Sequence, residues 1–330
     1  MKKISYTDPS VRLTGRWDVT NPEYAEATAP GSYIEFAFEG KMAVALFDTL
    51  LNAEPRLHLW IEIDGGARTE VTLDGYIRIN AKEEGTHICR IIYKSTMEHY
   101  ARWYRPLRSK VSFMGYIAEA PATLPEDNRK IIEFVGDSIT EGVLVDEDYY
   151  RPVGRPLHAV EHLCRPQQDD ACGTYAWLTA EALDLRPIIM GYGAVGTTRA
   201  GCGAVPPAAE AYPYNFDGSP ITRPTPDIVV INHGANDRGA KAEVYTEKYG
   251  QLLDKVREIN PNAKVVSVSA FCGGHHVALG EFIKKYNEEK GADVVFIDTF
   301  GWIPVEPLHP LRDGHKTVAQ NLTRILKDII

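Results

Sequence analysis

The sequence predicts two domains of different construction: an antiparallel, jelly-roll-like β-sandwich followed by an α/β domain in which helices cover both faces of a parallel sheet. Short apolar or alternating runs, separated by turn-forming residues, fill roughly the first 120 positions, as in sandwich proteins. Strand and helix patterns alternate from residue 131 onward, which calls for a parallel sheet with right-handed crossovers. The length of 330 residues also suggests about two domains. We therefore divide the chain into residues 1–122 and 123–330.

Turn-forming pairs such as Asp64-Gly65 and Asp74-Gly75 separate the expected strands of the first domain. We expect these strands at residues 32–40, 42–48, 56–64, 69–74, 86–95 and 110–119. The segment 122–130 that follows is polar and contains a proline, so we interpret it as the linker.

The strands expected in the second domain are nearly continuous runs of Val and Ile, which is typical of strands covered on both faces. They lie at residues 131–136, 187–193, 227–234, 264–270 and 292–298. Helical patterns lie between them and after the last one, at 174–185, 242–259, 278–291 and 314–330. This order predicts a three-layer α/β/α domain.

Composition and charge exclude several classes of protein. There are 36 Lys and Arg residues against 45 Asp and Glu, a formal net charge of −9, which argues against nonspecific binding of nucleic acid. No apolar run approaches the roughly 18 residues of a membrane span, so no membrane partner is expected. The five cysteines have no repeated spacing, and the N-terminus has no apolar stretch after its two lysines. We therefore expect a cytoplasmic protein without a disulfide framework, and the sequence does not indicate its oligomeric state.

Residues suited to catalysis follow the expected strands of the second domain, where ligands bind in open parallel sheets. The first strand continues into Gly136-Asp137-Ser138, and Ser138 is expected near a helix N-terminus, where backbone N–H groups can stabilise an oxyanion. A simple helix cap is the alternative for this tripeptide. The second strand leads into a glycine loop containing Gly196, which could also be a structural turn. Asn236 follows the third strand.

A histidine, His309, lies between two prolines just before the closing helix. The order of the four blocks, Ser138, Gly196, Asn236 and then His309, resembles that of the SGNH (GDSL) hydrolases over residues 131–330. The resemblance implies a serine esterase with Ser138 as nucleophile, Gly196 and Asn236 as oxyanion donors, and His309 as base. It requires no metal and no cofactor.

The acid of the catalytic triad is the point at which this chain departs from the family. The resemblance implies an aspartate three residues before the histidine, and this chain has Glu306 there. Glu306 precedes a proline, which favours an extended backbone. We expect Glu306 to support His309 but to matter less than Ser138 or His309.

A β-sandwich joined to an SGNH domain is similar to the arrangement in carbohydrate esterase family 2. That resemblance implies removal of O-acetyl groups from carbohydrates, with an acetylated oligosaccharide as the substrate. Some members of that family lack the acid and hold the histidine with a backbone carbonyl. Trp302 lies in the loop of His309. It could stack on a sugar ring, and the alternative is that it packs in the core.

Two further clusters contain side chains of the types that bind metals. His158 and His162, with Cys164 and Cys172 nearby, have no zinc-signature spacing, so we predict no metal site there. We interpret the surrounding segment 145–172 as a loop at the rim of the pocket.

The second cluster, residues 272–276, contains two histidines and follows the fourth strand, where a role in the pocket wall is expected. His315, at the start of the last helix, is expected to be structural.

Two other functions stay open at the level of sequence. One is an SGNH arylesterase or lysophospholipase that acts on a non-carbohydrate ester. The other is a noncatalytic carbohydrate-binding protein with a decayed hydrolase domain, against which Ser138, Asn236 and His309 all count.

Overall fold

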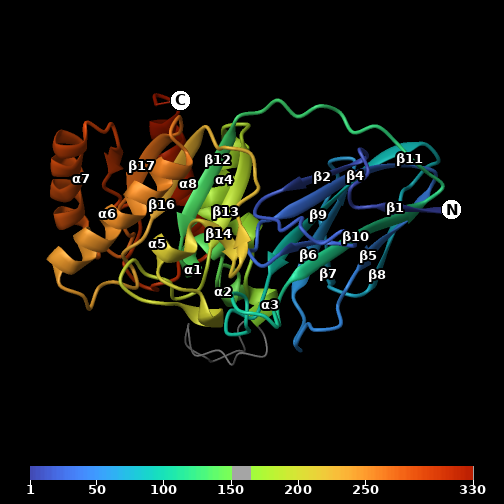
Figure 1. The fold of residues 1–330 in the computed structure, drawn as a ribbon, viewed down its shortest axis with the longest axis horizontal. Helices are drawn as coiled ribbons and strands as arrows, with labels where there is room; N and C mark the ends of the chain where they lie inside the picture. The colour runs from blue at the N-terminus through green and yellow to red at the C-terminus, as the bar shows by residue number, and fades with distance from the viewer. Residues whose placement is uncertain (151–164, 330) are drawn as a thin grey trace.

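The computed structural model describes residues 1–150 and 165–329. It contains two bodies that pack side by side, and the extended segment 122–130 runs from the end of the first to the start of the second (Figure 1). The predicted division at 122/123 falls in this segment and stays a prediction.

The first body is a sandwich of two antiparallel sheets, as predicted. One sheet contains β1 (Lys2–Ser5), β3 (Ala25–Ala27), β5 (Met42–Phe47), β8 (Tyr76–Asn80) and β10 (Val111–Ala118). The other contains β2 (Val11–Thr14), β4 (Tyr33–Glu39), β6 (His58–Ile63), β7 (Thr69–Thr72), β9 (Thr86–Ser95) and β11 (Ala120–Pro121). Apolar side chains from both sheets fill the space between them. Phe36 of β4 and Tyr116 of β10, for example, stack with ring centroids 4.4 Å apart.

The second body is built on a parallel sheet in the order β13-β12-β16-β17-β18. Its strands are β12 (Ile131–Gly136), β13 (Arg186–Gly191), β16 (Ile228–Asn232), β17 (Lys264–Val268) and β18 (Val295–Ile297). All five coincide with runs that the sequence predicts. The edge strand β13 lies beside β2 of the sandwich, and the short strand β18 forms the other edge (Figure 1). A two-stranded hairpin, β14 (Tyr214–Phe216) and β15 (Ser219–Pro220), lies outside this sheet.

Helices cover both faces of the parallel sheet, which gives the predicted three layers. The long helices are α4 (Tyr175–Ala182), α6 (Ala242–Ile259), α7 (His276–Lys290) and α8 (Arg312–Leu326). Successive side chains of β12 alternate between the faces: Phe134 packs with α4 and α8, and Val135 packs with α6 and α7. One-turn helices lie in the loops, namely α1 (Ser138–Glu141), α2 (Glu147–Tyr150), α3 (Arg165–Gln168), α5 (Ala208–Ala211), η2 (Ala171–Gly173) and η3 (Cys202–Ala204).

A buried ion-pair cluster joins the two bodies. Glu133 of β12 accepts hydrogen bonds from Arg16 Nε of the sandwich at 3.1 Å and from Arg223 Nη2 at 2.5 Å. The hydroxyl of Tyr212 donates to the same carboxylate at 2.7 Å. The side chains of Arg16, Arg223 and Glu133 are 0–2% exposed. The interface is therefore held by charges that solvent does not screen.

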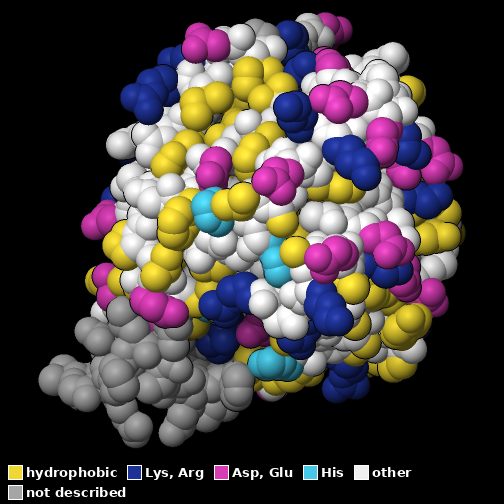
Figure 2. All heavy atoms as spheres, turned by 90° about the vertical axis from the view of Figure 1, so that its left-hand side faces the viewer, with side chains coloured by type: hydrophobic (Ala, Val, Ile, Leu, Met, Phe, Trp, Pro, Cys, Tyr) yellow, Lys and Arg dark blue, Asp and Glu magenta, His cyan; other side chains and the backbone are white. Residues whose placement is uncertain are grey.

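The surface of the second body is mixed in charge. Figure 2 shows the face formed by α6 and α7, over which acidic and basic side chains are interspersed. Among the described residues no helix combines the length and the apolarity that a bilayer span requires. The four described cysteines, Cys89, Cys172, Cys202 and Cys272, are all free thiols.

Candidate active site

Three strands of the parallel sheet end at the same level. Gly136 at the end of β12 pairs with Gly191 of β13 on one side and with Asn232 of β16 on the other. The loops that follow therefore leave the sheet at one edge. Two of the predicted oxyanion donors and the predicted nucleophile lie in these loops.

Ser138 is the first residue of α1, and its hydroxyl faces the predicted base. Asp137 caps the helix by accepting from the N–H of Ile139 at 2.9 Å, which fixes the turn on which Ser138 sits. His309 arrives from the loop before α8, and its Nε2 atom lies 2.9 Å from Ser138 Oγ. The tripeptide is thus both a cap and a nucleophile turn. A serine at this distance can donate its proton to a neutral imidazole.

Asn236 lies beside the nucleophile turn. Its side-chain amide donates to Asp137 Oδ2 at 3.2 Å and to the carbonyl oxygen of Val195 at 3.0 Å. Burial raises the pKa of Asp137 to about 7, and the nearby charge of Asp237 adds to this effect. Both hydrogens of the Asn236 amide are therefore engaged in the structure, next to the serine.

The loop that contains Gly196 is held by a carboxylate. Asp237, which is fully buried, accepts from the backbone N–H groups of Thr197 and Thr198 at 3.0 and 2.8 Å and from the Thr198 hydroxyl at 2.6 Å. A Cβ atom on Gly196 would lie 2.6 Å from Asp237 Oδ1, so only glycine permits this approach. The Gly196 N–H itself donates to the carbonyl oxygen of Arg199 at 3.1 Å.

This geometry agrees with the families that the sequence matches. Residues 134–317, more than half of the chain, match the GDSL-like Lipase/Acylhydrolase family. The chain belongs to that family. Residues 13–103 match a second family, Carbohydrate esterase 2 N-terminal. The GDSL-like domain thus contains Ser138, Asn236 and His309, and the second match lies in the sandwich.

Known relatives span both domains of this GDSL-like protein. Cellulase/esterase CelE of Acetivibrio thermocellus is 24% identical over 97% of the chain, which spans 40% of the length of that relative. A family two carbohydrate esterase from Clostridium thermocellum, solved in complex with cellohexaose, superposes with a TM-score of 0.77 at 19% identity, covering 96% of this chain and 98% of that one. An acetyl xylan esterase from Butyrivibrio proteoclasticus gives 0.76 at 18% identity, covering 98% and 96%. These structures share the two-domain fold.

The structure does not bring Glu306 to the Ser138–His309 pair of this GDSL-like domain. Glu306 is exposed, and within residues 1–150 and 165–329 it has no hydrogen bond or ion pair with His309. Its place in the triad therefore stays a prediction. The sequence motif places an acid three residues before the histidine, but the backbone of residues 306–309 carries the side chain to solvent.

Trp302 is half-buried and packs against the apolar cluster between the sheet and the helices α4 and α8. This packing agrees with the alternative that Trp302 is a core residue. Exposed aromatic surface nearby comes instead from Phe300, which is 51% exposed and stacks on His276 with ring centroids 4.5 Å apart. A role for Trp302 in sugar binding stays a prediction.

The remaining predicted clusters are structural where they can be followed. His158, His162 and Cys164 lie outside the described residues, as does half of the predicted rim loop, namely 151–164. His275 Nε2 donates to the carbonyl oxygen of Asp237, 2.9 Å away, and so supports the loop after β16. His315 is buried with its Nδ1 atom bonded to the N–H of Tyr175, and burial lowers its pKa to about 3.

One group of metal-ligand side chains occurs among the described residues: Glu98, His99 and Cys202. Glu98 is already paired with Arg165 at 3.0 Å. Burial, with the charge of Glu98, raises the pKa of the Cys202 thiol to about 11, so the thiolate that a metal prefers is disfavoured. The carboxylate of this group is engaged by an arginine in the structure, so we assign no metal to it.

Sequence reasoning missed the part that the sandwich takes in this site. The segment after β9 enters the hydrolase domain, where the buried Arg102 pairs with Glu141 of α1 at 2.5 Å. Trp103 beside it packs against Met190 and Tyr192. Both side chains therefore pack between the two bodies. Their nearness to α1 has no signal in the spacing of the sequence.

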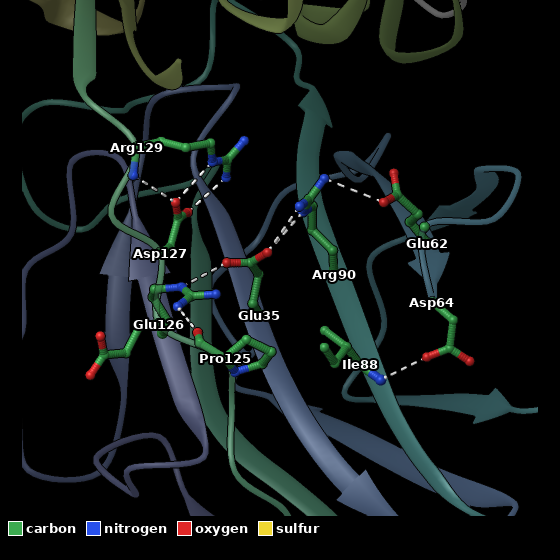
Figure 3. Close-up of a pocket in the computed structure, with 11 residues that line it drawn as sticks. Glu35, Glu62, Asp64, Ile88, Arg90, Pro125, Glu126, Asp127 and Arg129 are labelled. Atoms are coloured by element: carbon green, nitrogen blue, oxygen red, sulfur yellow. Dashed lines mark hydrogen bonds and ion pairs between the residues drawn. The ribbon is translucent and has the colours of Figure 1, made fainter. Parts of the chain in front are cut away.

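A pocket on the sandwich is distinct from this site. It lies over β4 and β9, where the linker residues Pro125 and Asp127 close it from one side (Figure 3). Arg12 bonds the carbonyl oxygen of Pro125 at 2.8 Å and the carboxylate of Glu35 at 2.8 Å. Figure 3 shows ion pairs of Arg90 with Glu35 and Glu62 and of Arg129 with Asp127. Together with the two bonds of Arg12, these contacts hold the linker on the sandwich.

The role of Asp237 leads to a first prediction. Asp237→Asn keeps the shape of the side chain but replaces an acceptor of three hydrogen bonds with an amide, so the loop of Gly196 loses part of its support. Because hydrogen bonds to a charged group contribute about 1.5–3 kcal/mol, we expect a loss of that order in the free energy of unfolding, together with a lower kcat. Urea unfolding and p-nitrophenyl acetate hydrolysis measure the two effects. Unchanged values in both assays would contradict the prediction.

Proposed function

We propose that this GDSL-like protein is a carbohydrate O-acetyl esterase that works through an acyl-enzyme on Ser138. The observation that carries the proposal is the 2.9 Å contact between Ser138 Oγ and His309 Nε2 at the carboxyl edge of the sheet. Support for the carbohydrate comes from the relatives: the family two esterase solved with cellohexaose and the acetyl xylan esterase share both domains with this chain.

The proposed reaction begins when Ser138 Oγ attacks the acetyl carbonyl and His309 Nε2 takes its proton. The tetrahedral intermediate collapses to an acetyl-serine as His309 returns the proton to the leaving sugar hydroxyl. Water then repeats the sequence and releases acetate. Neither step requires a metal or a cofactor.

The negative oxygen of the intermediate needs hydrogen-bond donors. We propose the Ser138 N–H and the Asn236 amide for this role. Asn236 lies next to the nucleophile turn, and one of its two N–H groups must leave Asp137 or the Val195 carbonyl to reach the oxyanion. Gly196 is the third proposed donor, and its use requires the Arg199 carbonyl to give up the N–H that it now accepts. Loss of one such donor typically costs about 3–4 kcal/mol of transition-state stabilisation.

The substrate class is tested by two ester series. Hydrolysis of p-nitrophenyl acetate with little hydrolysis of the octanoate supports an acetyl esterase, and the reverse preference would indicate a lipolytic or aryl esterase. Acetate release from acetylated manno-, xylo- and gluco-oligosaccharides then identifies the sugar. No turnover of any ester would overturn the proposed function.

A second prediction concerns the acid. Because Glu306 is exposed and, within residues 1–150 and 165–329, makes no hydrogen bond to the histidine, we expect Glu306→Ala to keep at least about a tenth of wild-type kcat, whereas His309→Ala loses on the order of a thousandfold. Both variants are assayed with the same acetyl ester. An equal loss in the two would mean that Glu306 completes a full triad when substrate is bound.

A further inference from the structure

We propose that Glu98 of the β-sandwich is a positioning residue of the esterase site: its carboxylate supports the loop after β13 and stabilises the protonated form of His309. The inference rests on the proposed function and assigns part of that reaction to the N-terminal domain. Glu98 follows β9, 40 residues before the nucleophile, and only 8% of its surface is exposed.

The first argument is the contact between Glu98 and the glycine loop. A Cβ atom on Gly193 would lie 2.0 Å from Glu98 Oε2, which means that the carboxylate rests directly on the backbone of this loop. Gly193 lies three residues before Gly196, the proposed oxyanion donor. A displacement of Glu98 therefore removes a contact that supports the backbone of this loop.

The second argument is that the sandwich segment and this loop are bonded into one unit. The Arg102 N–H donates to the carbonyl oxygen of Gly203 at 3.1 Å, and the Cys202 N–H donates to the carbonyl oxygen of Gly193 at 2.7 Å. Arg102 also pairs with Glu141, the last residue of the nucleophile helix α1. The segment that contains Glu98 is thus bonded both to the loop after β13 and to the helix of Ser138.

The third argument is electrostatic. Burial alone would raise the pKa of Glu98, but Arg165 and Arg102 outweigh it and hold the pKa below its usual value, with His309 among the positive groups that contribute. Glu98 is therefore ionised at neutral pH and within the electrostatic reach of the imidazole. A carboxylate in that position favours imidazolium, the species that His309 becomes when it accepts the serine proton.

Other charged groups surround Glu98 and share its field. Arg165 at 3.0 Å and His99 at 3.7 Å are its ion-pair partners. Among the residues that the structure describes, the other titratable groups that interact with it are Arg102, Glu141, Asp169 and Cys202. Cys202 is neutral because its pKa is raised to about 11, and His315, which also interacts with His309, is neutral because burial lowers its pKa to about 3.

The test replaces Glu98 by its uncharged isostere, Glu98→Gln. Removal of the negative charge lowers the pKa of His309, so the acidic limb of the pH profile of kcat/KM for p-nitrophenyl acetate moves to lower pH, by about half a unit to one unit. The same limb is followed in the rate at which a fluorophosphonate labels Ser138, since that reaction also needs neutral His309. Labelling of Ser138 without ester turnover would overturn the proposed function, and the pH dependence of the labelling rate would then decide the Glu98 proposal by itself.

Asp169→Asn is the matched control. Asp169 pairs with the other side of Arg165, 3.3 Å from its Nε atom, so this variant loosens the same arginine without removing the charge of Glu98. Burial raises the pKa of Asp169 itself to about 7, so this variant also removes a group that titrates near the limb, and we expect its acidic limb to move clearly less than that of Glu98→Gln. An unmoved limb in Glu98→Gln, or an equal shift in both variants, overturns the proposal.

Glu98→Asp replaces Glu98→Gln if that variant does not fold. The shorter side chain moves the carboxylate away by one methylene, so we expect the acidic limb to move in the same direction by less. No shift in Glu98→Asp also overturns the proposal.

Discussion

Ser138→Ala is expected to abolish ester hydrolysis and to leave the fold intact. The side chain contributes one hydroxyl, 2.9 Å from His309 Nε2, while the cap of the helix is made by Asp137 and the Ile139 N–H. Without the nucleophile no acyl-enzyme forms, so we expect kcat to fall on the order of a thousandfold or more, with binding and oxyanion groups left in place. Initial rates with p-nitrophenyl acetate measure the loss.

A matched control comes from the same one-turn helix. The Thr140 hydroxyl lies 2.9 Å from the Tyr175 hydroxyl and is fully buried. Thr140→Val should cost about 1 kcal/mol of stability and keep most of the activity. Turnover by Ser138→Ala above about one part in a hundred of wild type would exclude the serine mechanism, provided that thermal unfolding shows an intact fold.

Glu133→Gln is expected to have the largest effect on stability. Glu133 is the common partner of Arg16 and Arg223, and all three side chains are buried. The neutral amide leaves two guanidinium groups without a counter-charge in a site that water does not reach. Breaking a buried pair in this way typically costs about 3–5 kcal/mol, which urea unfolding would register as a lower midpoint.

The pH dependence of that effect has a definite sign. Burial raises the pKa of Glu133, but Arg16 and Arg223 outweigh it and hold the pKa below its usual value. A carboxyl group whose pKa is lower in the folded state contributes stability above its unfolded pKa and loses it as the pH falls through the folded value. The difference between wild type and Glu133→Gln should therefore be full at neutral pH and shrink in acid below pH of about 4.

Glu35→Gln provides the comparison. Glu35 is also buried and also pairs with two arginines, but Arg12 and Arg90 are 23% and 27% exposed and all three lie within the sandwich and its linker. Water can hydrate these arginines when the charge is removed, so we expect a loss well below that of Glu133→Gln. Equal losses would mean that burial at the domain interface does not decide the energy.

The elements that the sequence predicts well are those with long, unambiguous patterns. The bounds predicted for 131–136 and 242–259 are those that the structure gives, because the first is apolar except for Glu133 and the second is a long amphipathic pattern. The strand Lys2–Ser5 was missed because only Ile4 in it is buried. Tyr76–Asn80 was missed although it alternates, because it directly follows the turn at Asp74-Gly75.

The residues of the site also differ in how well the sequence predicts them. Ser138 and His309 are found because a family motif fixes their order along the chain, and the structure brings them together. Glu98 and Arg102 belong to another domain and carry no motif, so only the folded arrangement shows that they lie against the catalytic loops. For Glu306 the motif gives only the position in the sequence, and its part in the triad stays a prediction, with the side chain exposed in the structure.

The position of the sandwich beside β13 also bears on aggregation. An edge strand offers unpaired N–H and C=O groups to any other chain, and a long apolar edge is a template for intermolecular pairing. At one edge of the parallel sheet, β18 has only three residues. At the other, β13 has six, of which Pro187–Gly191 are buried, and β2 of the sandwich lies next to it (Figure 1). The N-terminal domain thus shields the sheet edge at which the hydrolase domain would otherwise be most prone to self-association.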